Sequence, residues 1–373
     1  MLKQDFMNKM FQLVSLLFFF GALFSNLNAQ EVRKYSNEFL NIGVGAEAIG
    51  LGNTKTATSR NLYSFYYNPA SLVQVDDVFQ AGYMHSEYFA GIAKYDYLGV
   101  AVPIDSSRTI GVSFIRFGID DIPNTLELFE PDGSINYDKI TKFTVADYAL
   151  YISYAQKIKQ IKGLDVGGNL KIIHRSVGPF AKAWGFGIDL ALNYQYKNWR
   201  FGLMAKDVTS TYNAWSFSFT DKQEQILLQT DNFIPVSSVE LTAPSFNLGA
   251  SYIFDIKKKL FIEPMVDFLF FTDGRRNVLF RTDPVSIDAR FGLELNYSKI
   301  VYLRTGFSSA YWSEDNSGDQ TVFNFQPTIG VGVNIKDWFF IDYAFANIGN
   351  GDKFYSHVIS AHFAMKTKPK KKY

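Results

Sequence analysis

The strongest constraint on the fold is an alternation of apolar and polar residues that continues over long stretches of the chain. Between residues 184 and 196 the even positions are Trp184, Phe186, Ile188, Leu190, Leu192, Tyr194 and Tyr196, whereas the odd positions carry Gly, Asp, Ala, Asn and Gln. Residues 285–297 repeat the pattern with apolar side chains at the odd positions. Successive side chains of a β-strand point to opposite faces, so each stretch predicts a strand with one apolar and one polar face. Its length fits a tilted membrane-spanning strand.

The same pattern predicts fourteen strands along the chain. They span residues 77–87, 93–104, 108–118, 143–157, 163–175, 183–196, 199–208, 244–256, 259–272, 284–297, 300–310, 322–335, 338–347 and 353–366. Their connections alternate between short polar turns and longer loops, including 119–142 and 210–238. Tight periplasmic turns and long external loops are typical of outer-membrane barrels. We therefore predict an all-β fold, a fourteen-stranded antiparallel transmembrane barrel over residues 76–366, located in the cell outer membrane.

A soluble secreted sandwich or large barrel would also show alternation, with its polar face in water. Three features favour the membrane barrel: the length of the strands, the glycines on their polar face, and the aromatic side chains near strand ends. Aromatic residues make up 17% of the chain, which fits girdles of such side chains at both membrane interfaces.

The N-terminal part of the chain lacks this alternation. Residues 1–29 resemble a signal peptide, with a basic start, an apolar run over 11–24 and a small residue before the expected cleavage site. Residues 30–75 are rich in Gly, Ala, Ser and Thr and contain the turn signal Asn68-Pro69-Ala70. We interpret them as a plug inside the barrel, with a helical turn near residues 46–49. Residues 367–373 form a basic C-terminal tail.

Catalytic and metal-binding patterns are not found. The chain has no Cys, and its four His residues lack ligand spacing. No phosphate-binding loop, dinucleotide fingerprint or nucleophile motif is present. The net charge of +1 gives no general attraction to nucleic acid. We therefore predict a protein that is not an enzyme, has no cofactor or metal, binds no nucleic acid and is surrounded by outer-membrane lipid.

Charged residues occupy the polar face of the predicted strands, which becomes the lumen of a membrane barrel. They are Asp147, Asp165, Lys171, Asp189, Arg200, Asp288, Arg290, Glu294, Arg304 and Asp342. Both signs occur, and buried charges need partners, which favours a paired network that also holds the plug. A selectivity lining for a channel is the alternative.

The loop 210–238 is the candidate partner-binding element. It carries Tyr212, Trp215, Phe217 and Phe219, and exposed apolar residues on a loop indicate a partner, a lipid contact or a neighbouring loop. Trp215 to Phe219 also alternates with serine, so this stretch is equally consistent with a barrel strand that continues above the membrane.

Several motifs together resemble the PorV/PorQ family of Bacteroidetes outer-membrane proteins, which is itself similar to FadL-type barrels. They lie in residues 39–46, 50–53 and 67–72 of the plug, and in residues 88–97, 117–125 and 214–217. The resemblance covers nearly the whole mature chain. Ser71 stands where the family has Gly, and Ser59-Arg60 stands where it has an acidic pair.

The resemblance implies a barrel with an N-terminal hatch that works in the type IX secretion system. Its expected partners are the translocon barrel and the C-terminal domains of exported cargo. The alternative is a FadL-like channel for uptake of a hydrophobic small molecule, which would need an apolar pocket.

Overall fold

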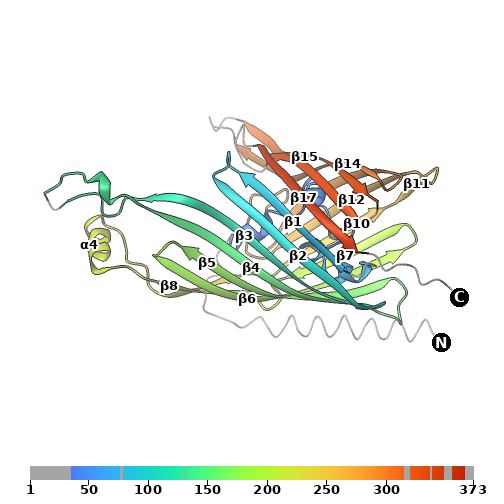
Figure 1. Cartoon of the computed structure of the whole chain (residues 1–373), viewed down its shortest axis with the longest axis horizontal. Helices are drawn as coiled ribbons and strands as arrows, with labels where there is room; N and C mark the ends of the chain where they lie inside the picture. Colours follow the sequence, from blue (N-terminus) through green and yellow to red (C-terminus); the bar gives the residue numbers. More distant parts are fainter. Residues whose placement is uncertain are drawn as a thin grey trace. The chain divides into compact units, whose positions relative to one another are not determined.

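The computed structural model describes residues 35–75, 79–130, 132–314, 320–336, 338–347 and 355–365 (Figure 1). The predicted signal peptide (1–29), the basic tail (367–373) and the first five residues of the predicted plug (30–34) lie outside these ranges.

Seventeen strands are present among the described residues, all in one antiparallel sheet. They are β1 (Phe79–Tyr88), β2 (Ala93–Asp105), β3 (Arg108–Asn124), β4 (Thr141–Lys157), β5 (Leu164–Val177), β6 (Ala181–Tyr196), β7 (Trp199–Lys206), β8 (Thr211–Phe217), β9 (Ser238–Thr242), β10 (Ser245–Tyr252), β11 (Phe254–Ile256), β12 (Leu260–Phe271), β13 (Ser286–Tyr297), β14 (Val301–Glu314), β15 (Thr321–Ile335), β16 (Phe339–Asn347) and β17 (Tyr355–Met365).

The sheet closes on itself because β1 pairs with both β2 and β17. β7 and β8 both pair with β6, one after the other, so they occupy one position in the wall. β9, β10 and β11 follow one another along the next position, where β9 pairs with β8 and β10 pairs with β7. The described strands therefore form a closed barrel with fourteen strand positions, which confirms the predicted fold class.

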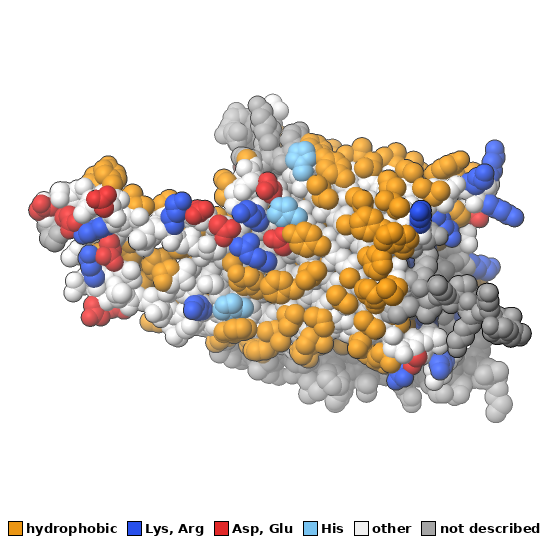
Figure 2. All heavy atoms as spheres, in the orientation of Figure 1, with side chains coloured by type: hydrophobic (Ala, Val, Ile, Leu, Met, Phe, Trp, Pro, Cys, Tyr) orange, Lys and Arg blue, Asp and Glu red, His pale blue; other side chains and the backbone are white. Residues whose placement is uncertain are grey.

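The two faces of the wall differ as the alternation predicts. In β6 every second residue is exposed, and the exposed residues include Trp184, Phe186 and Leu190. The residues between them, such as Asp189 and Asn193, are buried in the interior. Figure 2 shows hydrophobic side chains spread over the outside of the barrel wall. An apolar outer surface and a polar interior are the arrangement of a barrel in lipid.

The helical segments lie mostly in the N-terminal part. They are η1 (Glu38–Asn41), α2 (Ala46–Ile49), α3 (Ser64–Tyr67), η2 (Pro69–Gln74), η3 (Tyr137–Lys139) and α4 (Asp221–Gln229). The first four carry many fully buried side chains and pack against the inward face of the wall. α2 begins and ends at the residues predicted for the helical turn.

Two predicted loops contain more regular structure than expected. β3 continues six residues beyond its predicted end at 118, to Asn124, through a register shift between Ile119 and Ile122. Such a bulge adds a residue to one strand and breaks the alternation, so the pattern stops before the strand does. The predicted loop 210–238 contains β8, α4 and the start of β9, and in Figure 1 these lie beyond the barrel wall with the ends of β3 and β4.

Candidate functional site

Residues 35–75, here called the inner segment, are hydrogen bonded to strands around the barrel. The hydroxyls of Tyr95 and Tyr97 on β2 donate to carbonyls of the inner segment at 3.1 and 2.8 Å. On the C-terminal side of the barrel, Ser360 of β17 accepts a hydrogen bond from the backbone N–H of Ala46 at 3.0 Å. Contacts from strands far apart in the sequence place this segment inside the barrel.

The turn Asn68-Pro69-Ala70 lies near the C-terminal end of the inner segment. The Asn68 side chain is fully buried; it accepts a hydrogen bond from Ala70 N–H and donates to the carbonyls of Thr56 (2.7 Å) and Leu192 of β6 (3.0 Å). Pro69 occupies the first turn of η2, where its missing N–H costs nothing. One side chain thus caps η2 and ties two parts of the inner segment to the wall.

Glycines on the inward face let the backbone of this segment approach the strands. A Cβ on Gly202 of β7 would lie 2.1 Å from the carbonyl oxygen of Thr56. A Cβ on Gly167 of β5 would lie 2.6 Å from the nitrogen of Ala70. Strand glycines weaken a strand unless something packs closely against them, and here that partner is the inner segment.

The first group of lumen charges surrounds Lys171. Its ammonium is 2.8 Å from Asp189 and also bonds Asp207, and its side chain is only 2% exposed. Asp207 lies in the break between β7 and β8 and also accepts from the Thr211 hydroxyl. A buried cation between two carboxylates is a satisfied ion group, since each charge has an opposite partner within hydrogen-bonding distance.

The second group surrounds Arg304 of β14. Its guanidinium donates to Glu294 at 2.8 Å and to Asp342 at 2.6 Å, and the side chain is 4% exposed. Glu47 of the inner segment lies nearby and is bonded by Lys55 and by Asn61, the latter at 2.7 Å. Burial by itself raises the pKa of Glu47, but the charges of Lys55 and Arg304 outweigh it and hold that pKa well below its usual range.

The remaining predicted charges also have polar partners. The pairs are Asp147 with Arg175 (2.8 Å), Asp165 with Gln74 (2.9 Å), Arg200 with Glu263 (2.7 Å) and Asp288 with Arg290 (3.0 Å). Charges of both signs are therefore paired with near neighbours along the inner wall instead of forming a ring of one sign.

Several interior residues were missed by the sequence analysis. Asp267 of β12 accepts hydrogen bonds from the backbone N–H and the hydroxyl of Thr56 at 2.9 and 2.7 Å. Glu263, on the same strand, pairs with Arg200. Both lie at alternate positions of the predicted strand 259–272, so the alternation alone could have placed them in the lumen.

One small cavity lies between the inner segment and the wall. A cavity of about 30 Å³ lies among Tyr66, Lys206, Asp207, Pro244 and Arg276, next to the break between β7 and β8. That volume holds a water molecule or two. Within the described ranges, no three His, Cys, Asp or Glu side chains are grouped to hold a metal ion.

The aromatic residues of the candidate partner-binding loop lie mostly on a strand, in agreement with the alternative of a barrel strand that continues above the membrane. Tyr212, Trp215 and Phe217 belong to β8, and Phe219 follows it. The Trp215 indole donates to Glu240 of β9 at 2.9 Å, and Phe219 stacks on Phe180 with ring centroids 5.9 Å apart. Trp215, Phe217 and Phe219 are half-buried, whereas Tyr212 is exposed on the opposite face. These side chains stabilise the extension of the sheet above the barrel.

The most exposed apolar side chains lie beyond that strand. We call residues 120–143 and 211–242 the outer platform; Figure 1 shows α4 at the same end of the barrel as the β3–β4 connection. Lys222 of α4 bonds Glu127 of that connection at 2.7 Å, and this hydrogen bond lowers the pKa of Glu127 below its usual value. On the platform Tyr137 is 69% and Phe233 95% exposed.

No protein-family model matches the chain, and no curated protein matches it. Among solved structures, the chain is similar to the CymD monoaromatic hydrocarbon channel, with a TM-score of 0.55, 13% identity, and coverage of 87% of this chain and 98% of that one. It is also similar to the Pseudomonas putida toluene transporter TodX (TM-score 0.53, 12% identity, 87% and 99% covered) and the Ralstonia pickettii toluene transporter TbuX (TM-score 0.51, 13% identity, 87% and 98% covered). At such identities the likeness is one of fold.

The described strands thus form a closed barrel with the fold of these channels and transporters, and its apolar outer surface agrees with the predicted location in the outer membrane. Within the described part of the chain, no helix has the length and apolarity needed to span a membrane.

Proposed function

We propose that this outer-membrane barrel is a non-enzymatic docking protein, which binds another protein through its outer platform while its inner segment keeps the lumen closed. The observation that carries this proposal is the exposure of large apolar side chains on the platform. Phe129, Tyr137 and Leu228 are 64%, 69% and 59% exposed, and Phe233 and Val236 are 95% and 78% exposed. A group of such side chains outside the lipid-facing wall is the usual mark of a protein contact.

The platform is also braced for such a role. β8 and β9 continue the barrel sheet outward, and the Lys222–Glu127 ion pair links α4 to the β3–β4 connection. These contacts restrain the helix and loops that carry the exposed side chains, so less conformational entropy is lost on association than with unrestrained loops.

The finer proposal is a component of the type IX secretion system. It rests on the resemblance of residues 39–46, 67–72, 88–97 and 117–125 to the PorV/PorQ family. The partner would then be the translocon barrel or the C-terminal domain of exported cargo. The comparisons with known proteins give this assignment no independent support.

A second candidate is a channel for a hydrophobic small molecule, favoured by the fold shared with CymD, TodX and TbuX. The interior argues against an open path of this kind. The cavity beside the break between β7 and β8 measures about 30 Å³, whereas a cavity of about 150 Å³ holds one benzene. The wall around the cavity presents Lys206, Asp207 and Arg276. A channel would require the inner segment to leave its present position.

The two candidates are separated by one pull-down from native outer membranes in mild detergent, with mass spectrometry of proteins and lipids. The variant Phe233→Ala removes an apolar platform side chain, and the matched control Phe280→Ala removes a 52% exposed phenyl ring on another loop. A translocon barrel or cargo protein recovered with wild type and control, but reduced with Phe233→Ala, supports docking. A barrel recovered without any protein partner and with a bound hydrophobic molecule refutes docking and supports the channel.

A further inference from the structure

The turns at the short-loop end of the barrel share a positive charge. Among the described residues, each of the six connections there contains Lys or Arg: Arg108, Lys157, Lys159, Lys162, Lys197, Lys257, Lys258, Lys259, Lys299 and Lys336. The described acidic residues beside them at this end are Asp105, Asp255 and Asp165, the last of which lies opposite Lys157 on the neighbouring strand. Figure 2 shows Lys and Arg side chains at the right-hand end of the barrel, whereas the opposite end mixes both signs. We call these ten cations the basic rim.

Backbone geometry shows that turn formation does not account for these lysines. Lys257 and Lys258 have φ of 57° and 60°, and Lys299 has φ of 59°. Lys197 and Lys336, in two other turns, have φ of 53° and 54°. Tight hairpin turns with positive φ favour Gly, Asn or Asp, since other side chains make this conformation costly. Lysine in these positions therefore costs backbone free energy, and what it adds is a positive charge.

The charges of the basic rim are largely available to a partner. Arg108 is bonded to Asp105 at 2.6 Å. Within the described part of the chain, none of the nine rim lysines forms an ion pair, although Lys197 lies over the ring of Tyr196 at 5.4 Å. A ring of unpaired ammonium groups repels itself, so it is favoured where anions lie opposite it.

The position of the rim identifies those anions. Exposed apolar side chains of the outer wall lie directly beside the lysines, among them Tyr196, Trp199, Tyr297 and Trp338. Aromatic residues of this kind lie at the level of lipid headgroups, and lysines beside them reach toward phosphates. The rim cations come from turns all around the barrel, where a single docked protein could not contact them all. Lipid surrounds a membrane barrel on every side.

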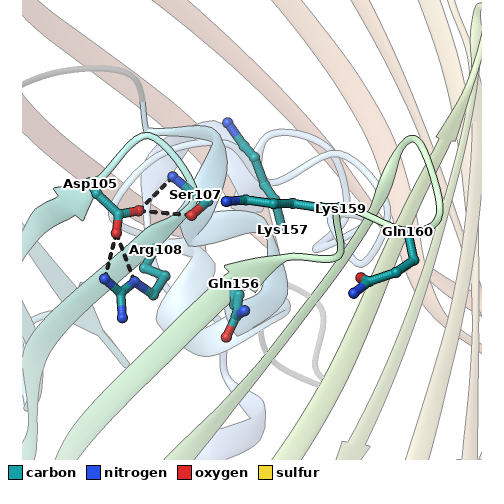
Figure 3. Close-up of a pocket in the computed structure, with 7 residues that line it drawn as sticks. All are labelled: Asp105, Ser107, Arg108, Gln156, Lys157, Lys159 and Gln160. Carbon is teal, nitrogen blue, oxygen red and sulfur yellow. Dashed lines mark hydrogen bonds and ion pairs between the residues drawn. The ribbon is translucent and has the colours of Figure 1, made fainter.

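One site on the rim has the form of a phosphate pocket. A cavity of about 270 Å³, open to solvent, lies between the β2–β3 and β4–β5 turns (Figure 3). Lys157, Lys159 and Arg108 line it, together with Ser107, Gln156, Gln160 and one acidic residue, Asp105. Ser107 and Arg108 are bonded to Asp105. The ammonium groups of the two lysines and the two glutamine amides are the donors left for phosphate oxygens.

We propose that the basic rim binds the phosphate groups of anionic phospholipids in the periplasmic leaflet, with the pocket of Lys157 and Lys159 as its most specific site. The binding would hold the short-turn end at a fixed depth in that leaflet. It requires the outer-membrane location but not the docking function.

The test is native mass spectrometry of the purified full-length barrel titrated with phosphatidylglycerol, phosphatidylcholine or inorganic phosphate. The variant Lys157→Gln/Lys159→Gln removes two rim charges, and Lys139→Gln/Lys142→Gln removes two charges at the opposite end. A lysine near an anionic lipid surface contributes about fivefold to affinity. We expect wild type and control to retain phosphatidylglycerol over phosphatidylcholine, and the rim variant to lose that preference by about 25-fold.

Equal retention of phosphatidylglycerol by the rim variant and the control overturns the proposal. So does binding of inorganic phosphate as tight as that of phosphatidylglycerol, because the site would then take free phosphate. If the first variant does not show the heat-dependent gel shift of a folded barrel, Lys257→Gln/Lys258→Gln replaces it. These two side chains lie in an exposed turn and make no ion pair among the described residues.

Discussion

The closed lumen predicts a specific response to Gly202→Ala. The new Cβ would lie 2.1 Å from the Thr56 carbonyl oxygen and 2.9 Å from Cα of Ala57, and both atoms are backbone that cannot rotate away. Ordinary contact begins at 3.4 Å, so the inner segment must retreat by about 1.3 Å at this point. Overpacking of this kind costs about 1–3 kcal/mol. The shift also strains the two hydrogen bonds from Thr56 to Asp267.

A loss of about 2 kcal/mol raises the fraction of molecules with a displaced inner segment about 30-fold. We therefore expect frequent opening events in planar-bilayer recordings of Gly202→Ala, where wild type stays closed. The urea concentration at which half of the protein loses the heat-dependent gel shift of the folded barrel should fall as well.

The matched control is Gly118→Ala, whose added Cβ meets only the end of the flexible Arg116 side chain. It should behave as wild type in both assays. Closed recordings and an unchanged midpoint for Gly202→Ala would mean that the inner segment is not what closes the barrel, and the argument from close packing would be wrong.

Two more predictions concern the ion pairs of the lumen. Arg304→Met leaves Glu294 and Asp342 without their shared cation. Because loss of one partner of a buried pair costs about 3–5 kcal/mol, the urea midpoint of unfolding should fall clearly below that of wild type. An unchanged midpoint would show that these carboxylates are solvated. Glu47 has a folded-state pKa lowered by Lys55 and Arg304, so its stabilising contribution is present above its usual pKa of 4.5 and is lost as the pH falls through the folded value. The frequency of channel openings in planar bilayers should therefore increase below pH 4.5 in wild type, and this acid dependence should be absent in Glu47→Gln. An identical acid response in both proteins would assign the response to another titratable group.

The alternation of the sequence by itself determined the wall of the barrel. Residues 184–196 place apolar and polar side chains on opposite faces without any tertiary contact, because the two-residue period of a strand is a property of the backbone. Each of the fourteen predicted strands overlaps a described strand. The same period places Lys171, Asp189 and Arg304 on the inner face.

Tertiary structure alone decided which residues meet. Asp267 bonds Thr56, which is 211 positions away, and the alternation contains no information on partners at that distance. The bulge near Ile119 lengthens β3 where the pattern breaks. The hydrogen bond from Trp215 to Glu240 joins β8 to β9, and the alternation does not specify that partner. A strand pattern specifies which way a side chain points, but the identity of its neighbour depends on how the barrel closes around the inner segment.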